Sequence, residues 1–318
     1  MRYDMALSHL EFEKIFTFAE SFEPWQIRPL RDVRHVAVFG VPIDTGNLAE
    51  GAPRLEVVDS MSRSLAAVVP LDGVKAGQFR VTDGVSYPYH EYRPGLAWDI
   101  ARDRIYVVYP DEERLSVVDL TVGRVIASEP IQPRASVLDN LLAALVPTVE
   151  AKSVPTMQHW AVLSPDGSRL YVSGAREEGT LVAPNRYDWT FTPEGLRVID
   201  TQDLAEIARV DLPGSAFALA PGGRPLLVHT FRATSEHRVR LLDANSLNEF
   251  ASLDVEDAFD LRGFSPDGRY AYIARAGLPA PMTVFRVVDV SDGHVVAERV
   301  VDGYFANLLL NPSGSPDM

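Results

Sequence analysis

The chain has 318 residues, of which 46% are hydrophobic and 23% are charged, and it contains no cysteine. This apolar content is enough to fill a core and excludes global disorder, while the missing cysteines exclude disulfides and thiolate zinc sites. The net charge of −14 argues against nucleic acid or an anionic membrane as the main partner. No apolar run reaches the roughly 18 residues of a membrane helix, so we expect no membrane insertion.

Residues 1–21 precede the first regular repeat. Within them, Leu10–Phe18 aligns with Leu247–Val255, and on that register it is the outermost strand of a part-blade. The alternative is a short amphipathic helix over residues 7–22 that packs on an end blade. The N-terminus also lacks the basic-then-apolar layout of a signal peptide.

Two kinds of hairpin alternate from about residue 22 to residue 302. The first kind is clearest in Leu163–Val172 (LSPDGSRLYV) and Phe264–Ile273 (FSPDGRYAYI), with less regular copies at Trp98–Val107 and Leu219–Val228. In each of the two clear copies, a short apolar strand meets a turn that Pro and Asp begin. Gly then supplies a positive φ before the second strand returns.

The second kind of hairpin is an apolar strand that ends at an aspartate, followed by a polar turn and another strand. These aspartates are Asp59, Asp119, Asp200, Asp243 and Asp289. We interpret each as an Asx turn, in which the side chain accepts hydrogen bonds from backbone N–H groups, rather than as a metal ligand or catalytic acid.

Two hairpins make four antiparallel strands, and five such units fit between residues 22 and 302. Four-stranded units at this spacing, with almost no helical signal, are typical of propeller blades. We therefore predict an all-β chain, a β-propeller of four-stranded antiparallel blades. It would have five whole blades plus part-blades at both termini, in a six- or seven-bladed ring that is complete or incomplete. Residues 1–318 are treated as a single domain.

The C-terminal segment, residues 303–318, has the pattern of an innermost strand that runs into its turn. It could close the ring by joining the N-terminal strand in one shared blade, which would leave no free sheet edge. Alternatively, the chain is a truncated piece of a longer propeller. A shared blade needs four strands, and only the first and last are visible, so we favour the incomplete ring.

The turns and strands resemble the YVTN family of β-propeller repeats, which includes lactonase-like and surface-layer-like propellers and looks WD40-like. The matching features are the Ser-Pro-Asp-Gly turns at 164–167 and 265–268, the strand Leu170–Ser173, and the Val-Val-Asp strands. The resemblance implies the fold but carries no site, because these are turn and packing residues. It also implies a periplasmic or extracellular bacterial protein, whereas the sequence alone, without an export signal, favours the cytoplasm.

The long insertions fall on one side of the predicted blades. They are a loop over residues 174–194 inside the third blade, connections over 72–94 and 130–158, and a loop over 41–53. Residues 136–146 have apolar residues at helical spacing and predict a short helix that covers the early blades. Long loops on one face of a rigid scaffold indicate a binding surface.

Most candidate site residues lie in or next to these insertions. His90 and His159 each come just before an expected innermost strand, so we expect both to approach the central channel on this face. We predict that the candidate residues line a pocket for an anionic or sugar-like ligand, with the two aromatic residues of the 174–194 loop as stacking walls. The set is His90, Arg93, His159, Trp160, Arg176, Tyr187, Trp189 and Arg232. In the alternative interpretation, the charged members form surface ion pairs with Glu91, Glu177, Glu178 and Glu236, which contribute little to stability.

No catalytic, phosphate-binding or metal-binding motif is present in the sequence, so we expect no cofactor and no metal. The favoured hypothesis is a non-enzymatic module that binds a protein or carbohydrate partner through the loop-rich face. The alternatives are a lactonase-like hydrolase, the propeller subunit of a quinone-dependent amine dehydrogenase, or a structural module of a longer chain. A hydrolase would use His90 or His159 as base with Arg176 stabilising the oxyanion.

Overall fold

The protein is described by a computed structural model that covers most of the chain. The described residues are 22–42, 53–80, 89–133, 156–183, 186–212, 214–223, 226–230, 237–255, 260–277 and 282–302. Nearly all of their regular structure is β-strand, with one short 3-10 helix, η2 (Ile100–Arg102), and no α-helix among them. Within these ranges, no helix has the length and apolarity needed to cross a membrane.

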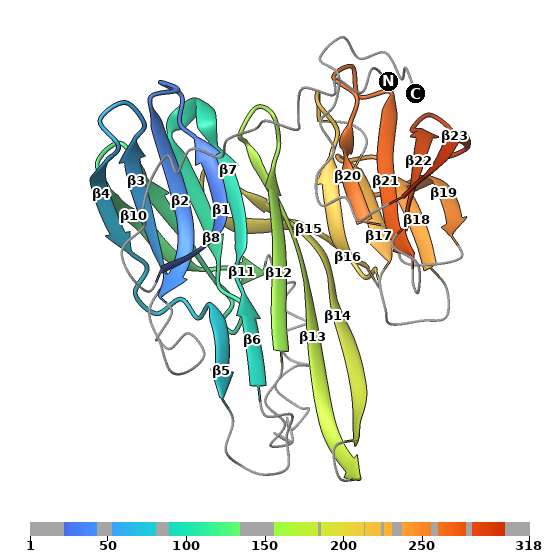
Figure 1. The fold of residues 1–318 in the computed structure, drawn as a ribbon, viewed down its shortest axis with the longest axis horizontal. Coiled ribbons are helices and arrows are strands. Elements are labelled where there is room, and N and C mark those ends of the chain that lie inside the picture. The colour runs from blue at the N-terminus through green and yellow to red at the C-terminus, as the bar shows by residue number, and fades with distance from the viewer. Residues whose placement is uncertain are drawn as a thin grey trace.

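Four of the predicted units are separate four-stranded antiparallel sheets in which neighbours in sequence are neighbours in space (Figure 1). Blade 1 consists of β1 (Phe22–Pro29), β2 (His35–Pro42), β3 (Arg54–Asp59) and β4 (Ser64–Pro70). Blade 2 consists of β7 (Gly95–Asp99), β8 (Arg104–Val108), β9 (Arg114–Asp119) and β10 (Arg124–Pro130). Blade 4 consists of β16 (Gly214–Leu219), β17 (Leu226–Thr230), β18 (His237–Leu242) and β19 (Glu249–Val255). Blade 5 consists of β20 (Asp260–Phe264), β21 (Tyr270–Gly277), β22 (Met282–Asp289) and β23 (Val295–Asp302).

Blade 3 belongs to a larger, seven-stranded sheet. Its own strands are β12 (Thr156–Leu163), β13 (Arg169–Ala183), β14 (Arg186–Asp200) and β15 (Ala205–Val210). A hairpin of β5 (Gly77–Arg80) and β6 (Tyr89–Arg93) joins it through parallel pairing of β6 with β12. On the other side, β11 (Gln132–Pro133) pairs in parallel with β15.

The connection over residues 72–94 is therefore not the simple loop that the sequence analysis predicted. Part of it is the β5–β6 hairpin. On β6, every second residue is buried, namely His90 and Tyr92, so both lie on one face of the strand. That period of two is characteristic of a strand.

Hydrophobic cores join each blade to the next in chain order. One cluster contains Phe39 and Leu55 of blade 1 with Ile105 of blade 2, and similar clusters join blades 2 and 3, 3 and 4, and 4 and 5. Because a single four-stranded sheet cannot bury both of its faces, this stacking is the source of the fold's stability. No such cluster among the described residues joins blade 5 to blade 1. The all-β propeller prediction is confirmed, and the single-domain assignment stays a prediction.

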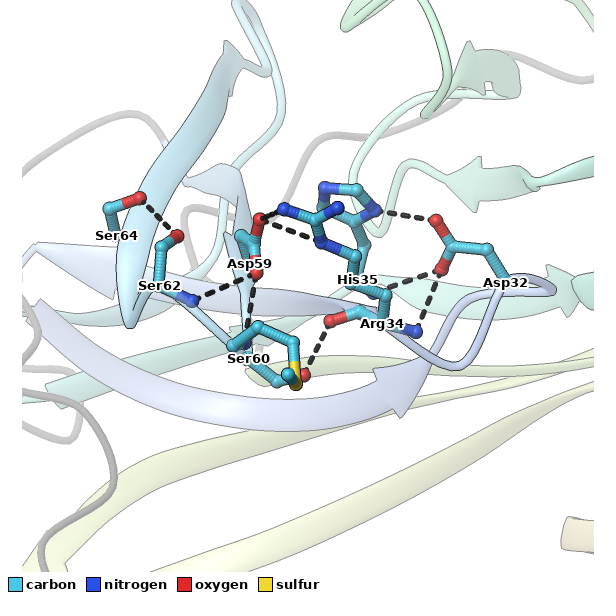
Figure 2. Close-up of polar contacts among 8 residues, drawn as sticks. Asp32, Arg34, His35, Asp59, Ser60, Ser62 and Ser64 are labelled. Carbon is cyan, nitrogen blue, oxygen red and sulfur yellow. Dashed lines mark hydrogen bonds and ion pairs between the residues drawn. The ribbon is translucent and has the colours of Figure 1, made fainter.

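The recurring aspartates form Asx turns, as predicted. Asp59 accepts hydrogen bonds from the backbone N–H groups of Met61 and Ser62, at 2.8 and 3.1 Å (Figure 2). The other four aspartates accept equivalent bonds, at 2.7 to 3.1 Å. The fourth residue after each aspartate has a positive φ, between 56° and 77°; these are Arg63, Gly123, Leu204, Leu247 and Gly293.

Figure 2 also shows how the two turns of blade 1 are joined. Arg34, in the turn between β1 and β2, donates through Nε to Asp59 at 2.9 Å. This bond, with those from the turn backbone, holds the pKa of the Asp59 carboxyl well below its ordinary value. Asp32 receives the backbone N–H of His35 at 2.9 Å and contacts the His35 ring Nδ1 at 2.6 Å.

Several predicted features lie outside the described residues. They are the strand or helix of residues 1–21, the helix over 136–146, the closing strand in 303–318, and most of the loop over 41–53.

Candidate functional site

The predicted loop over residues 174–194 is instead an extension of the blade-3 hairpin. β13 and β14 stay paired from Ala175 and Pro193 out to Ala183 and Arg186. We call residues 175–183 and 186–193 the arm. In Figure 1 the arm projects past the ends of the neighbouring blades, on the same side as β5 and β6. The prediction of a loop was wrong because the long insertion was interpreted as irregular, although its aromatic residues alternate with polar ones as in a strand.

A β-bulge separates the arm from the body of blade 3. The register shifts between Ser173 and Ala175 on β13, so that Gly174 lies opposite two residues of β14, Glu194 and Gly195. Gly195 has a φ of +75°, and a Cβ there would lie 2.8 Å from the carbonyl oxygen of Val210. Glycine is therefore required next to Leu196, where the pairing of β14 with β15 begins. Bulges of this kind redirect the neighbouring side chain.

The side chain redirected by the bulge is that of Glu194. Its Oε2 lies 2.7 Å from Nε2 of His159 on β12. The His159 side chain is only 5% exposed, and its Nδ1 has no hydrogen-bond partner among the described residues. Gly174 leaves the space for this pair, since a Cβ there would lie 2.3 Å from Cδ2 of His159 and 2.5 Å from Oε2 of Glu194.

Positive groups surround the Glu194 carboxylate. Burial alone would raise the pKa of Glu194, but the hydrogen bond to His159 and the charges of Arg197 and Arg176 outweigh burial and leave its pKa below the ordinary value. Arg197 is almost fully buried on β14 and forms an ion pair with Glu113, in the turn between β8 and β9. The base of the arm is thus held both to β12 and to blade 2.

The arm has two chemically different faces. Directly opposed residues of paired strands share a face, and successive residues alternate between faces. One face, the aromatic face, carries Leu181 opposite Tyr187, Gly179 opposite Trp189, and Glu177 opposite Phe191. The other face carries Asp188, Glu178 opposite Thr190, and Arg176 opposite Thr192.

On the aromatic face, Trp189 lies across Gly179. A Cβ on Gly179 would be 2.9 Å from Cζ3 of the indole, so the ring covers the place where a side chain would stand. The rings of Tyr187 and Trp189 are 6.2 Å apart between centroids and tilted by 45°. Trp189 is nevertheless 45% exposed, so nearly half of its surface faces solvent.

The two candidate histidines do not share a site. His90 on β6 and His159 on β12 lie on the same sheet face, but the pairs Tyr92–Met157 and Arg93–Gln158 set them roughly four residues apart along the ladder. At about 3.3 Å per residue, that is a separation of about 13 Å. The prediction that both precede an innermost strand is also corrected, because His159 lies within β12 itself.

The remaining candidates divide between the two interpretations. Arg93 forms an ion pair with Glu91, with Nε and Oε1 2.5 Å apart, and Arg176 lies 3.8 Å from Glu178. Both match the surface ion pairs of the alternative interpretation. Trp160 is adjacent to His159 on β12, so its side chain is on the opposite face of the sheet. Arg232 lies outside the described residues.

Sequence reasoning missed Glu194 as the partner of His159. The only local signal was the glycine that follows it, because a glycine inside a strand pattern often marks a bulge. Within the described ranges, no group of three or more histidine and carboxylate side chains is arranged to hold a metal ion. The structure thus offers a ribbon with one aromatic face, which extends from a partly buried His159–Glu194 pair.

No protein-family model and no curated protein matches the sequence. Solved structures do match. A chain of the mitotic checkpoint complex is 11% identical, with 94% of this chain and 71% of that chain covered and a TM-score of 0.53. Hydrazine synthase of Kuenenia stuttgartiensis is 14% identical, with 90% and 68% covered and a TM-score of 0.51. At these identities the likeness shows the β-propeller fold alone.

Proposed function

We propose that this protein is a non-enzymatic β-propeller module that binds a protein or carbohydrate partner on the side from which the arm projects. The observation that carries the proposal is the arm, a two-stranded ribbon with one aromatic face that extends beyond its blade. An isolated two-stranded ribbon is only marginally stable in water. An exposed aromatic surface adds a cost in solubility, so its presence on a surface points to binding.

The way in which the arm is mounted supports the same function. Its base is tied to β12 by the His159–Glu194 contact and to blade 2 by the Arg197–Glu113 pair. A rigid scaffold beneath a projecting element lowers the entropy that a partner must overcome on binding. Trp and Tyr are also the side chains most often found at the centre of binding surfaces.

A lactonase-like hydrolase is the second candidate, and the His159–Glu194 contact is the observation that favours it. A carboxylate that orients a histidine is a common arrangement for a general base, and Arg176 supplies a positive charge in the same region. The 5% exposure of the His159 side chain argues for a structural role instead. Lactone hydrolysis that disappears in His159→Ala, with the fold retained, would favour the enzyme.

The binding proposal is tested by removing the arm. Because Ala175 and Pro193 are directly paired, an Asn-Gly turn can join them in an arm-shortened variant. The wild-type protein and this variant are compared on a glycan array and a displayed peptide library. Phe250→Ala, which alters an exposed aromatic residue on β19, is the control.

We expect the arm-shortened variant to lose binding by tenfold or more, about 1.4 kcal/mol, while Phe250→Ala binds as the wild type does. Circular dichroism checks that the variant keeps its β-sheet signal. Unchanged binding of every partner found would contradict the proposal.

A further inference from the structure

Short turns form the end of the propeller that lies opposite the arm (Figure 1). They follow the first and the third strand of each blade, and antiparallel pairing places both turns at one end. In blades 1 and 2 these turns expose apolar side chains. Val33, after β1, and Met61, after β3, are each 80% exposed, and Val122, after β9, is 59% exposed.

The turns of blades 1 and 2 contact one another. The Ser60 N–H donates to the Arg34 carbonyl at 2.9 Å and joins the two turns of blade 1 (Figure 2). The Arg31 N–H donates to the Asp103 carboxylate at 2.9 Å, which joins blade 1 to blade 2. The Leu120 N–H donates to the Asp103 carbonyl at 2.8 Å and joins the two turns of blade 2. We call this surface the turn face; it consists of residues 30–34, 60–63, 100–103 and 120–123.

Val33 occupies a position that is glycine in three other blades. Its N–H donates to the carbonyl three residues earlier, and so do those of Gly167, Gly223 and Gly268 in the first turns of blades 3, 4 and 5, at 2.8 to 2.9 Å. All four residues have a positive φ, between 51° and 81°. This conformation suits glycine and strains a β-branched residue. Since the exposed Val33 side chain adds little to the core, the strain points to a function.

Met61 and Val122 also stand where other blades carry polar residues. They are the second residue after Asp59 and the third after Asp119. In blades 3, 4 and 5, these two positions after the turn aspartate hold Gln202 and Asp203, Asn245 and Ser246, and Ser291 and Asp292. The turn itself therefore does not require an apolar residue, and a group of such residues on one surface indicates a contact site.

The charges of the turn face favour an acidic occupant. The Arg34 side chain is 57% exposed and that of its partner Asp59 is 10% exposed; for Arg102 and Asp99 the values are 47% and 3%. Both aspartates also accept backbone N–H groups of their own turns. The carboxylates are thus turned inward and the guanidinium groups outward, and a guanidinium group can bond both oxygens of a carboxylate.

A short protein segment fits this face better than a membrane does. An anionic membrane would extend beyond the turn face and meet the field of a chain with a net charge of −14, whereas a short segment interacts with charges within about 8 Å. Membrane interfaces favour Trp and Tyr, and the four turns contain neither. Turns offer no strand edge, so the occupant binds through side chains, as a helix with its own backbone bonds satisfied can do.

We infer that the turn face binds a helical segment of another protein that carries aliphatic and acidic side chains on one face. Val33, Met61 and Val122 contact the aliphatic side chains, and Arg34 and Arg102 lie beside the carboxylates. This inference goes beyond the proposed function, because the turn face is at the opposite end from the arm and does not depend on it.

The test titrates an acetylated and amidated helical peptide with Leu and Glu on one face into the full chain by calorimetry. A second peptide replaces Glu with Gln, and a third replaces Leu with Ala. The double variant Val33→Gly/Met61→Gln introduces the residues that blade 3 has at these positions, so the turns should keep their conformation. Val300→Ser, at an exposed residue of β23, is the control, and the arm-shortened variant is measured alongside. Circular dichroism checks the fold of each variant.

We expect the wild type to bind the Leu–Glu peptide with a Kd of roughly 10–100 micromolar and the other two peptides about tenfold more weakly. The double variant should lose affinity about tenfold, while Val300→Ser and the arm-shortened variant bind as the wild type does. No binding of the Leu–Glu peptide, equal affinity for the Gln peptide, or equal affinity of the double variant overturns the inference.

Sedimentation with vesicles of phosphatidylcholine and phosphatidylserine tests the membrane alternative. We expect no binding to the vesicles. Binding that the double variant loses would assign the turn face to a membrane and overturn the inference. None of these results bears on the arm, whose proposed role is tested with the arm-shortened variant and other probes.

Discussion

Gly174 and His159 are packed so closely that Gly174 has no room for a side chain: a Cβ there would lie 2.3 Å from the imidazole Cδ2. The φ of Gly174 is not left-handed, so the restriction comes from space alone. Glycine at this position lets the bulge bring Glu194 onto His159. The geometry of the arm's base therefore depends on the absence of a side chain at Gly174.

Gly174→Ala should accordingly destabilise the protein. Forcing a methyl group into an occupied site costs about 1–3 kcal/mol, which urea unfolding measures. In a His159→Ala background the closest clash is removed, and only the flexible Glu194 carboxylate, 2.5 Å from the added Cβ, has to move. The added cost of Gly174→Ala should then fall below about 1 kcal/mol. An equal cost in both backgrounds would show that His159 is not the residue that clashes with the added methyl group.

Removing the carboxylate of Glu194 should cost more than removing a surface carboxylate. Glu194→Ala leaves the His159 ring buried without its hydrogen bond, which we expect to lower the free energy of unfolding by about 1–3 kcal/mol. Glu112→Ala is the control, because both side chains of its ion pair with Arg114 are about half exposed, at 48% and 46%; it should cost under about 0.5 kcal/mol. Similar losses from the two variants would argue against a structural role for the His159–Glu194 pair.

The Ser-Pro-Asp-Gly turn at 164–167 predicts a particular acid sensitivity. Asp166 accepts hydrogen bonds from the Ser164 hydroxyl at 2.6 Å and the Ser168 N–H at 3.0 Å, and these bonds lower its pKa to about 2. In the unfolded chain its pKa is about 3.9. The ionised Asp166 therefore stabilises the fold above about pH 4, and this contribution disappears as the pH falls through about 2.

Asp166→Asn tests this pH dependence. The variant should be less stable than the wild type at pH 7, and the difference should shrink as the pH falls from about 4 to about 2. Denaturant unfolding at several pH values measures both curves. A difference that stays constant over that range would contradict the assignment.

A substitution at Val33 should stabilise the protein. It lies in the turn between β1 and β2 with a φ of +51° and is 80% exposed, so a β-branched residue adopts a left-handed conformation without burial in return. Val33→Asn should raise the free energy of unfolding by about 0.5–1 kcal/mol, because asparagine tolerates this conformation. Val122→Asn provides the control: Val122 is also exposed, at 59%, but has no positive φ, so we expect no gain there. Equal changes at the two sites would show that strain at Val33 is unimportant.

The parts of the fold that were predictable from sequence are those fixed by local contacts. Asp59 accepts hydrogen bonds from Met61 and Ser62, two and three residues away, so the turn can be predicted from neighbouring residues in the sequence. The strands were predictable for the same reason, since they recur with their turns. The base of the arm depends on distant pairs instead. Glu194 and His159 are 35 residues apart, and Arg197 and Glu113 are 84 apart, and no local pattern encodes either contact.

The arm itself lies between these cases. Tyr187, Trp189 and Phe191 alternate with polar residues at the period of a strand, and the sequence before them contains Pro184 and Asn185, residue types that favour turns. The pattern was readable, but the length of the segment favoured its interpretation as a binding loop. Its two faces became apparent only from the pairing of β13 with β14.

The most direct test of the arm's role compares two adjacent residues that point to its opposite faces. For whichever partner the screen returns, the Kd is measured with Trp189→Ala and with Thr190→Ala. Because only Trp189 stands on the aromatic face, we predict that Trp189→Ala weakens binding tenfold or more and that Thr190→Ala changes it less than about twofold. Equal effects of the two substitutions, or none from either, would contradict a binding role for this face.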